Sequence, residues 1–313
     1  MVTLARPPRR PFRFGVQARN AGSAAGWREL ARRLEGLGVS TMTTADHFDD
    51  ALDPVVALAA AAEATATLRI GTLVLANDFR HPVVTARSAA SLDLLSGGRF
   101  ELGLGAGWKP DDYAGAGLDL DRAGVRIERL AEACAIVRSL LDTGSVDHQG
   151  AHYRVALNDQ PRPAARVPLV LGGGGRRMLR LAGRVADTVG LNLDLGAGRI
   201  DASAGADGTF ERSVEKLGWV AEGAGDRFAE LELQTRVHVA AVTGDAARVT
   251  AAAARFGLSG EQARRSPHVL VGTVDEICEQ LRRQREELGI SYLGISVADL
   301  DELAPVIERL TGT

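Results

Sequence analysis

The chain has 313 residues, of which 45% are hydrophobic and 25% charged, and its formal net charge is −3 at pH 7. This length suits one large α/β barrel or two ordinary domains. The charge gives no electrostatic reason to expect nucleic acid or an anionic membrane as a partner. No apolar run approaches the ~20 residues of a membrane span, and the basic N-terminal stretch lacks the features of a secretory signal. We therefore expect a cytoplasmic protein that acts on a small molecule.

Short apolar or β-branched runs alternate with amphipathic segments along the chain. Eight runs are typical of strands, and in chain order they cover residues 12–17, 39–45, 68–75, 99–107, 167–175, 185–192, 231–243 and 290–297. A helical pattern follows each run, and Asp53–Pro54 and Pro82 mark two of the helix starts. Residues 109–113, after the fourth run, are expected in a loop, where a mobile lid would be placed.

Eight strand–helix units predict a single (β/α)8 TIM barrel, because repeated right-handed β–α crossovers close naturally into a barrel. Two Rossmann-like halves are the alternative. We expect one domain over residues 1–313, with a hairpin inserted at about 145–157 and a mobile rim segment at about 192–210. Function in such a barrel sits at the carboxyl ends of the strands. Those ends carry Gln17, Asp46–His47, Asn77, Gly105–Trp108, Gly172–Gly175, Asn192, a polar stretch near His238, and Ser296.

Four consecutive glycines, Gly172–Gly175, join the fifth strand to a helix that opens with Arg176 and Arg177. Glycines let backbone N–H groups approach an anion closely, and a helix N-terminus favours negative charge. The segment therefore predicts a phosphate site, against the alternative of a flexible turn with two solvated arginines. In the fourth strand, Gly103, Gly105 and Gly107 alternate and share one face. Either a flat ligand or close strand packing explains them, and Trp108, which could wall a cleft, favours the ligand.

Asp46 and His47 end the second strand side by side. A histidine at the carboxyl end of a barrel strand, next to an acid, is a candidate proton donor or acceptor. The alternative is that Asp46 caps a turn and His47 lies on the rim. The next strand end offers Asp78, Arg80 and His81, although Pro82 suits a helix start there. Neither disulfides nor a metal site are expected, because the two cysteines lie far apart and no His, Asp and Glu set has metal-ligand spacing.

These motifs together resemble the bacterial-luciferase-like superfamily of flavin and deazaflavin enzymes, and more closely its branch that uses coenzyme F420. The resemblance is carried by "ADHF", "LRIGTLVLANDFRHPV", "LDLLSGGRFELGLGAGW", "AGVRIERLAEA", "VPLVLGGGGRRMLRLAGRVADTVGLN" and "VGTVDEI". It implies a barrel whose mouth holds the tricyclic ring of the cofactor, with the phosphate at the glycine loop after the fifth strand. It also implies a non-prolyl cis peptide near Leu73–Val74, bulging against the ring. A homodimer is compatible with the resemblance, but packing on the barrel explains the apolar helix faces equally well.

The resemblance assigns roles to individual residues. His47 would be the acid/base near the hydride-carrying carbon, and Asp46 would contact the ring or its ribityl chain. The other cofactor contacts would be Leu73, Val74, Ala106, Gly173, Gly174, Gly175 and Arg176, and the substrate pocket would include Gln17, Asn77, Trp108 and Asn192. Where sugar-phosphate dehydrogenases of the superfamily carry a glutamate, this chain has Trp108, which argues against glucose 6-phosphate and for a bulkier or more hydrophobic substrate.

The expected reaction is hydride transfer between reduced F420 and a C=C, C=N or C=O group, with His47 handling the proton. An FMN-dependent monooxygenase on the same barrel is the alternative enzyme. A protein that binds the cofactor without catalysis is the alternative from another class.

Overall fold

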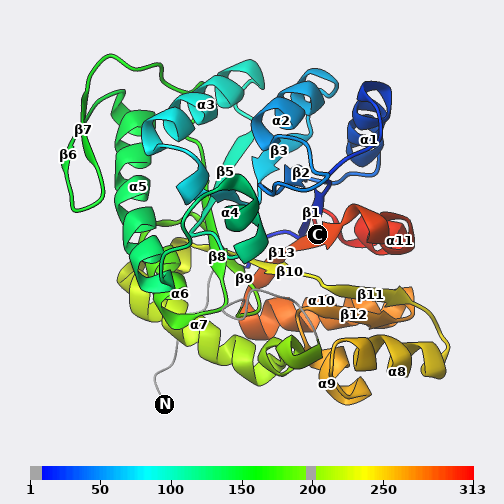
Figure 1. The fold of residues 1–313 in the computed structure, drawn as a ribbon. Coiled ribbons are helices and arrows are strands. Elements are labelled where there is room, and N and C mark those ends of the chain that lie inside the picture. The colour runs from blue at the N-terminus through cyan, green and yellow to red at the C-terminus, as the bar shows by residue number, and fades with distance from the viewer. Residues whose placement is uncertain (1–8, 195–201) are drawn as a thin grey trace. The chain divides into compact units, whose positions relative to one another are not determined.

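The structure is a computed structural model that describes residues 9–194 and 202–313 (Figure 1). Its main sheet has the strand order β3-β2-β1-β13-β10-β9-β8-β5-β4, and β3 also pairs with β5. Because parallel strands alternate with helices and the sheet returns to β3, this is the topology of a (β/α)8 barrel. The barrel prediction is confirmed, and the alternative of two Rossmann-like halves is wrong.

The strands and helices have the following bounds. The strands are β1 (Arg13–Gln17), β2 (Thr41–Thr44), β3 (Arg69–Thr72), β4 (Leu75–Ala76), β5 (Phe100–Gly105), β6 (Val146–Gln149), β7 (Arg154–Leu157), β8 (Leu169–Gly173), β9 (Thr188–Leu191), β10 (Glu232–Arg236), β11 (Val239–Val242), β12 (Val269–Gly272) and β13 (Ile290–Ser296). The α-helices are α1 (Ala24–Gly36), α2 (Pro54–Glu63), α3 (Pro82–Leu95), α4 (Pro110–Ala116), α5 (Ala123–Thr143), α6 (Arg176–Val185), α7 (Phe210–Ala224), α8 (Ala246–Arg255), α9 (Gly260–Arg265), α10 (Val274–Leu288) and α11 (Leu300–Leu310). Short 3₁₀ helices are η1 (Asn77–Phe79), η2 (Ala202–Gly208), η3 (Gly225–Glu230) and η4 (Val297–Asp299).

The chain divides into two compact units, which are described separately below. The first comprises Met1–Gln17, Gly36–Ser40 and Gly172–Thr313, and the second comprises Ala18–Glu35 and Thr41–Leu171. The single domain expected over residues 1–313 stays a prediction. Of the rim segment expected at about 192–210, residues 195–201 lie outside the described part of the chain, and η2 occupies most of the remainder.

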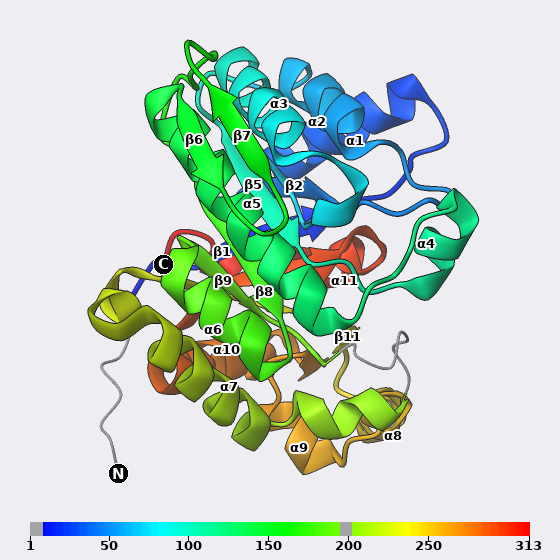
Figure 2. The same ribbon diagram turned by 60° about the vertical axis from the view of Figure 1, so that its left-hand side comes forward.

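In the second unit, the segment expected as a hairpin is the antiparallel pair β6–β7, which lies along α5 (Figure 2). Gln149 pairs with Arg154, so the turn is longer than the Gln149–Gly150 turn expected from the sequence. The carboxylate of Glu132 on α5 accepts hydrogen bonds from the backbone N–H groups of Ala151, His152 and Tyr153. One carboxylate therefore accepts hydrogen bonds from three backbone N–H groups in the hairpin turn.

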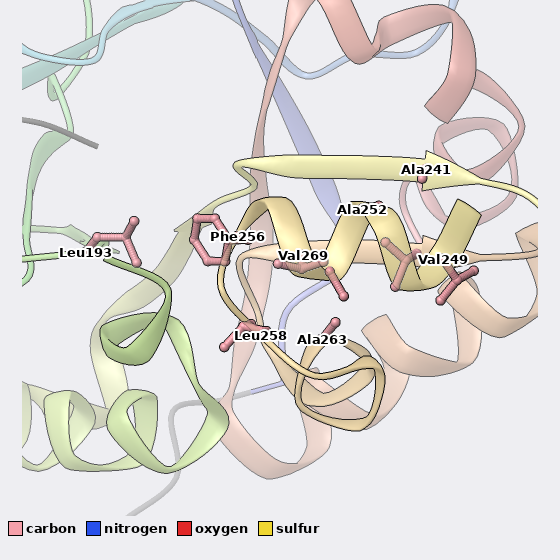
Figure 3. Close-up of a cluster of buried hydrophobic side chains, with 10 residues drawn as sticks. Leu193, Ala241, Val249, Ala252, Phe256, Leu258, Ala263 and Val269 are labelled. Carbon is pink, nitrogen blue, oxygen red and sulfur yellow. The ribbon is translucent and has the colours of Figure 1, made fainter. Parts of the chain in front are cut away.

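In the first unit, the run 231–243, expected as one strand, is two strands. β10 lies in the main sheet, whereas β11 leaves it and pairs in parallel with β12, a strand that the sequence analysis missed. This second sheet packs against α8 and α9. The buried side chains between them include Phe256, Val269 and Leu258, and the cluster extends to Leu193 in the segment after β9 (Figure 3). The small sheet thus contributes to an apolar cluster that includes the segment after β9.

Some large apolar side chains of the second unit stay on the surface. Val56 on α2 and Val84, Leu94 and Leu95 on α3 are exposed. The expected homodimer remains a prediction. No helix in the described ranges is both long enough and apolar enough to cross a membrane.

Candidate active site at the carboxyl ends of the strands

Residues become more exposed to solvent at the carboxyl ends of the strands. β2, β5 and β9 are buried throughout, whereas the residues that follow them, His47, Ala106, Trp108 and Asn192, are partly exposed. Gln17 at the end of β1 is also partly exposed. Each of these predicted site residues can therefore meet a ligand from the carboxyl end of its own strand.

The imidazole of His47 is held by a carboxylate that the sequence analysis did not assign to it. Nδ1 of His47 donates to Oδ2 of Asp112 over 2.6 Å. Oδ1 of the same carboxylate accepts from the backbone N–H of Phe48, at 3.3 Å. Trp108 lies edge-on to the imidazole, with ring centroids 6.0 Å apart. Because Nδ1 donates to the acid, Nε2 is left as the nitrogen that can exchange a proton with a ligand.

Asp112 lies on α4, in the segment that was expected to be a loop. Pro110 occupies the first turn of this short helix, and the buried Tyr113 donates from its hydroxyl to Asp78 over 2.9 Å. Burial and the nearby Asp78 carboxylate raise the pKa of Tyr113 above its ordinary value, so the phenol keeps its proton. The prediction of a loop here is wrong, because buried side chains dock the segment as a helix. Asp111 is exposed on the same helix.

The carboxylate of Asp46 is bound within the protein, although Asp46 precedes His47 directly. It forms an ion pair with Arg80, whose Nη2 lies 3.3 Å from Oδ1. Oδ2 also accepts from the backbone N–H of Ala76, at 3.2 Å. Arg80 makes a second contact, 3.1 Å long, with Asp53. Asp46 therefore ties the end of β2 to β4, and its expected contact with a cofactor ring stays a prediction.

The peptide bond between Leu73 and Val74 is cis, at the position that the resemblance implied. It separates β3 from β4, so the run 68–75 is not one continuous strand. Both residues are partly exposed. Leu73 is anchored by its N–H, which donates to the carbonyl of Thr44 over 2.8 Å. This places the bulge next to the end of β2, where His47 follows.

The alternating glycines of the fourth strand are explained by close packing. A Cβ added at Gly103 would lie 2.0 Å from the carbonyl oxygen of Thr72, and one at Gly105 would lie 2.5 Å from a methyl group of Val74. Gly107 has φ +76°, and its side-chain space is taken by the hydroxyl of Tyr113. The interpretation of these glycines as room for a flat ligand is therefore wrong, because the chain itself fills the space.

Asn77 is buried, and its amide donates to the hydroxyl of Tyr153 in the hairpin turn over 3.1 Å. Its expected place in the substrate pocket stays a prediction, although this contact already uses its amide.

His81 accepts from the N–H of Val83 and caps α3, which agrees with the alternative that it serves the helix start.

In the first unit, the glycine loop packs closely against the segment after β9, and its expected phosphate contact stays a prediction. A Cβ at Gly174 would lie 2.2 Å from the backbone of Leu193 and Asp194, so only glycine fits there. Gly175 precedes α6, and no side chain caps the helix. A helix N-terminus without a side-chain cap favours an anion. Arg176 is exposed and forms an ion pair with Glu222, at 3.0 Å, which partly offsets its charge.

Asn192, at the end of β9, binds a histidine from another strand end. Its Oδ1 lies 2.8 Å from Nε2 of His238, whose ring stacks on Phe256 with centroids 5.7 Å apart. Burial lowers the pKa of His238 to about 3, and that of the neighbouring His268 to about 4. Both imidazoles are therefore neutral at pH 7. His238 can donate or accept a hydrogen bond there but carries no charge.

A fully buried lysine binds the backbone at the same strand end. Nζ of Lys216, on α7, donates to the backbone carbonyl of Asn192 over 2.8 Å and to Oδ2 of Asp207 over 2.6 Å. Burial lowers the pKa of Lys216, while the hydrogen bond to Asp207 opposes that shift. The lysine thus fixes the backbone at Asn192, and its three donors are used within the protein.

The chain is similar to several known proteins. Residues 10–204 match the model of the luciferase-like monooxygenase family. The F420-dependent glucose-6-phosphate dehydrogenase of Amycolatopsis mediterranei is 33% identical over 168 residues, which are 51% of this chain and 50% of that protein. The pyrimidine monooxygenase RutA of Methylobacterium radiotolerans is 33% identical over 239 residues, covering 73% and 57% of the two chains. The matches span half of the first relative and somewhat more than half of the second.

Among solved structures, the F420-dependent tetrahydromethanopterin reductase from Methanopyrus kandleri superposes with a TM-score of 0.76. The superposition covers 96% of this chain and 98% of that one, at 17% identity. At this level of identity the likeness shows the fold, which is the barrel described above.

Proposed function

Because this chain belongs to the luciferase-like monooxygenase family, we propose that it is an oxidoreductase that uses the deazaflavin F420. It would transfer a hydride between the reduced cofactor and a C=C, C=N or C=O group of a small organic substrate, or in the reverse direction. The observation that carries the proposal is the His47–Asp112 pair, which follows β2 and leaves Nε2 of the histidine for a ligand. The relative from Amycolatopsis mediterranei, an F420-dependent dehydrogenase, supports the choice of cofactor.

The cofactor supplies a two-electron hydride carrier when it is bound. The glycine loop fits a phosphate group, since Gly174 leaves no room for a side chain and the N–H groups at the start of α6 have no cap. Leu73 and Val74 present the cis bulge that would contact the ring. His47 would move the proton at Nε2, and Asp112 would hold its tautomer and orientation.

Trp108 bears on the substrate. It lies edge-on to His47 at the position where sugar-phosphate dehydrogenases of the superfamily carry a glutamate. An indole offers an apolar surface and a single N–H donor, so it would favour a substrate with an apolar part over a sugar phosphate. We accordingly propose that glucose 6-phosphate is not the substrate.

Two measurements test the proposal. Titration of the purified protein with F420 and, separately, with FMN, followed by cofactor fluorescence, should give tight binding of F420. With F420 bound, His47→Gln should lower turnover by about 10²–10⁴-fold, the range for loss of a general acid or base, without changing the cofactor affinity. Unchanged turnover in this variant would remove the role of His47.

An FMN-dependent monooxygenase is the second candidate, favoured by the similarity to pyrimidine monooxygenase RutA. A plain flavin phosphate would suit the same glycine loop. Preference for FMN in the titration, together with oxygen consumption coupled to a flavin reductase, would establish this alternative. Tight binding of F420 without turnover across a broad panel of acceptors would instead indicate a binding protein.

A further inference from the structure

Side chains on four neighbouring strands of the first unit lie on the same face of the sheet, as the contacts among four of them show. Nε of Arg13 lies 2.8 Å from Glu232, and the hydroxyl of Thr188 also binds Glu232, at 3.0 Å. The guanidinium of Arg13 lies over the ring of Tyr292, 3.7 Å from its centroid. Arg13, Tyr292, Glu232 and Thr188 therefore lie on one face of β1, β13, β10 and β9.

Side chains two residues apart on a strand share a face, so the same face continues along each strand. In the register of these strands, Gln234 pairs with Tyr292 and with Gly190, and Gly294 pairs with Gly15 and with Arg236. A Cβ at Gly294 would lie 3.6 Å from Nε2 of Gln234, which confirms that the two face the same way. The residues of this face nearest the carboxyl ends of the four strands are Gln17, Ser296, Arg236 and Asn192, and we call them the end row.

Arg236 is the charged member of the end row, and its charge is not neutralised by a contact. The side chain makes no ion pair and no hydrogen bond within residues 9–194 and 202–313, and its Nη1 is buried without a partner. Burial lowers the pKa of Arg236 to about 10, against the opposing influence of Asp299, so the guanidinium stays charged at pH 7. Arg13 and Lys216 of this unit, by contrast, contact Glu232 and Asp207.

The position of Arg236 is fixed from its backbone. Nδ1 of His268 donates to the carbonyl oxygen of Arg236 over 2.8 Å, and the N–H of the next residue, Val237, donates to Gly294 over 2.8 Å. Two residues earlier on the same face of β10, Nε2 of Gln234 is also buried without a partner. Buried donors without partners are rare in proteins, and two on the same face of one strand point to a ligand that brings oxygen atoms.

We propose that Arg236 selects a substrate that carries a carboxylate, by pairing its guanidinium fork with that group. This inference rests on the proposed function, which it deepens by naming the substrate class. A planar guanidinium matches a carboxylate with two parallel hydrogen bonds, and a partly buried site strengthens that pairing. The anionic tail of F420 offers the same chemistry, so the experiment separates substrate from cofactor.

The test compares matched acceptors that differ only in charge. Crotonate and cinnamate are assayed beside crotonamide and cinnamamide, with reduced F420, for the wild type, Arg236→Met and Arg236→Lys. Arg255→Met is the control, because Arg255 is an exposed arginine on α8. Its charge, like that of Arg236, acts to lower the pKa of Asp299. We expect the wild type and the control to prefer the acids at least 10-fold in kcat/KM. The preference should fall to about one in Arg236→Met and lie between in Arg236→Lys, with the F420 affinity unchanged.

Three results would overturn the inference while leaving the proposed function standing. These are no preference for acids in the wild type, a preference that survives in Arg236→Met, or a loss of F420 affinity in Arg236→Met with an unchanged acid-to-amide ratio. The last would assign the guanidinium to the cofactor tail.

Thermal melting of the cofactor-free protein with each acid and amide decides the case if F420 is not bound or no acceptor is turned over. Stabilisation by the acids alone, lost in Arg236→Met but kept in Arg255→Met, would support the inference even though the proposed function had failed. Equal melting curves with acid and amide would overturn it.

Discussion

His47 donates from Nδ1 to Asp112, 2.6 Å away, rather than using the acid beside it in sequence. Asp46, the neighbour, is occupied by Arg80 and by the backbone of Ala76. The two aspartates therefore have different tasks: one orients an imidazole that is open to a ligand, and the other holds two strand ends together. This division leads to separate expectations for the two residues.

Replacing Asp112 by Asn should impair turnover without weakening cofactor binding. An amide can donate to Nδ1 and so favour the wrong tautomer of His47. We expect turnover to fall by about 10–100-fold and its pH profile to shift, measured by steady-state kinetics between pH 5 and 9. Asp111→Asn, on the exposed side of the same helix, is the matched control. Equal behaviour of the two variants would show that Asp112 does not position the histidine.

Replacing Asp46 by Asn should mainly cost stability. The change leaves Arg80 without its buried partner, and breaking such a pair typically costs about 3–5 kcal/mol in the free energy of unfolding. Asp53→Asn removes the second, half-exposed carboxylate of Arg80 but keeps a residue that can cap α2, so it should cost less than about 1 kcal/mol. Urea unfolding measures both. An Asp46→Asn protein of normal stability that lacks turnover would instead point to a chemical role.

The glycine loop offers a matched pair of substitutions. Gly174→Ala would push a methyl group to 2.2 Å from the backbone after β9, whereas the nearest atom to a methyl group at Gly175 lies 3.8 Å away. We expect the first change to lower the free energy of unfolding by about 1–3 kcal/mol and to abolish cofactor binding, because the loop must move. The second should stay within about 0.5 kcal/mol of the wild type. Similar melting temperatures of the two variants would contradict the packing described for Gly174.

The neutral buried histidines make stability depend on pH. His268 has a pKa of about 4 in the folded protein, against an ordinary value of about 6.5. Between these values the unfolded chain takes up a proton that the folded protein does not, so stability falls as the pH drops from about 6.5 towards 4. The slope is up to about 1.4 kcal/mol per pH unit for each such histidine. His268→Asn, whose amide can still donate to Arg236, should show a shallower fall in urea titrations at pH 7.5, 6.0 and 5.0. Parallel curves for the two proteins would contradict the assignment.

The barrel could be predicted because the sequence features that mark its strands lie within short stretches of the chain. Period and composition mark the eight runs that supply the strands of the main sheet, the run 68–75 supplying both β3 and β4, and glycines and prolines mark their ends. The run 231–243 shows the limit, because nothing in its apolar pattern marks the point where β10 ends and β11 leaves to pair with β12. Strand partners far apart in sequence leave no mark in a local pattern.

The site was predicted less completely, for a similar reason. The cis bond at Leu73–Val74 and the ends at His47 and Asn192 are where the motifs put them. Asp112 was missed because its contact with His47 is tertiary, although Pro110 carries the same helix-start signal that marked Pro54 and Pro82. Arg236 lay hidden inside a run taken for one continuous strand, and its lack of a partner is a property of the folded protein alone.

The distance along the chain between the two members of the His47–Asp112 pair also bears on how the protein is made. Asp112 comes 65 residues after His47, on a helix that is held by the buried Tyr113. A ribosome therefore releases the histidine well before the acid that orients it. Until α4 has emerged and docked, a nascent chain carries a histidine without its partner, so the pair proposed to handle the proton forms late in synthesis.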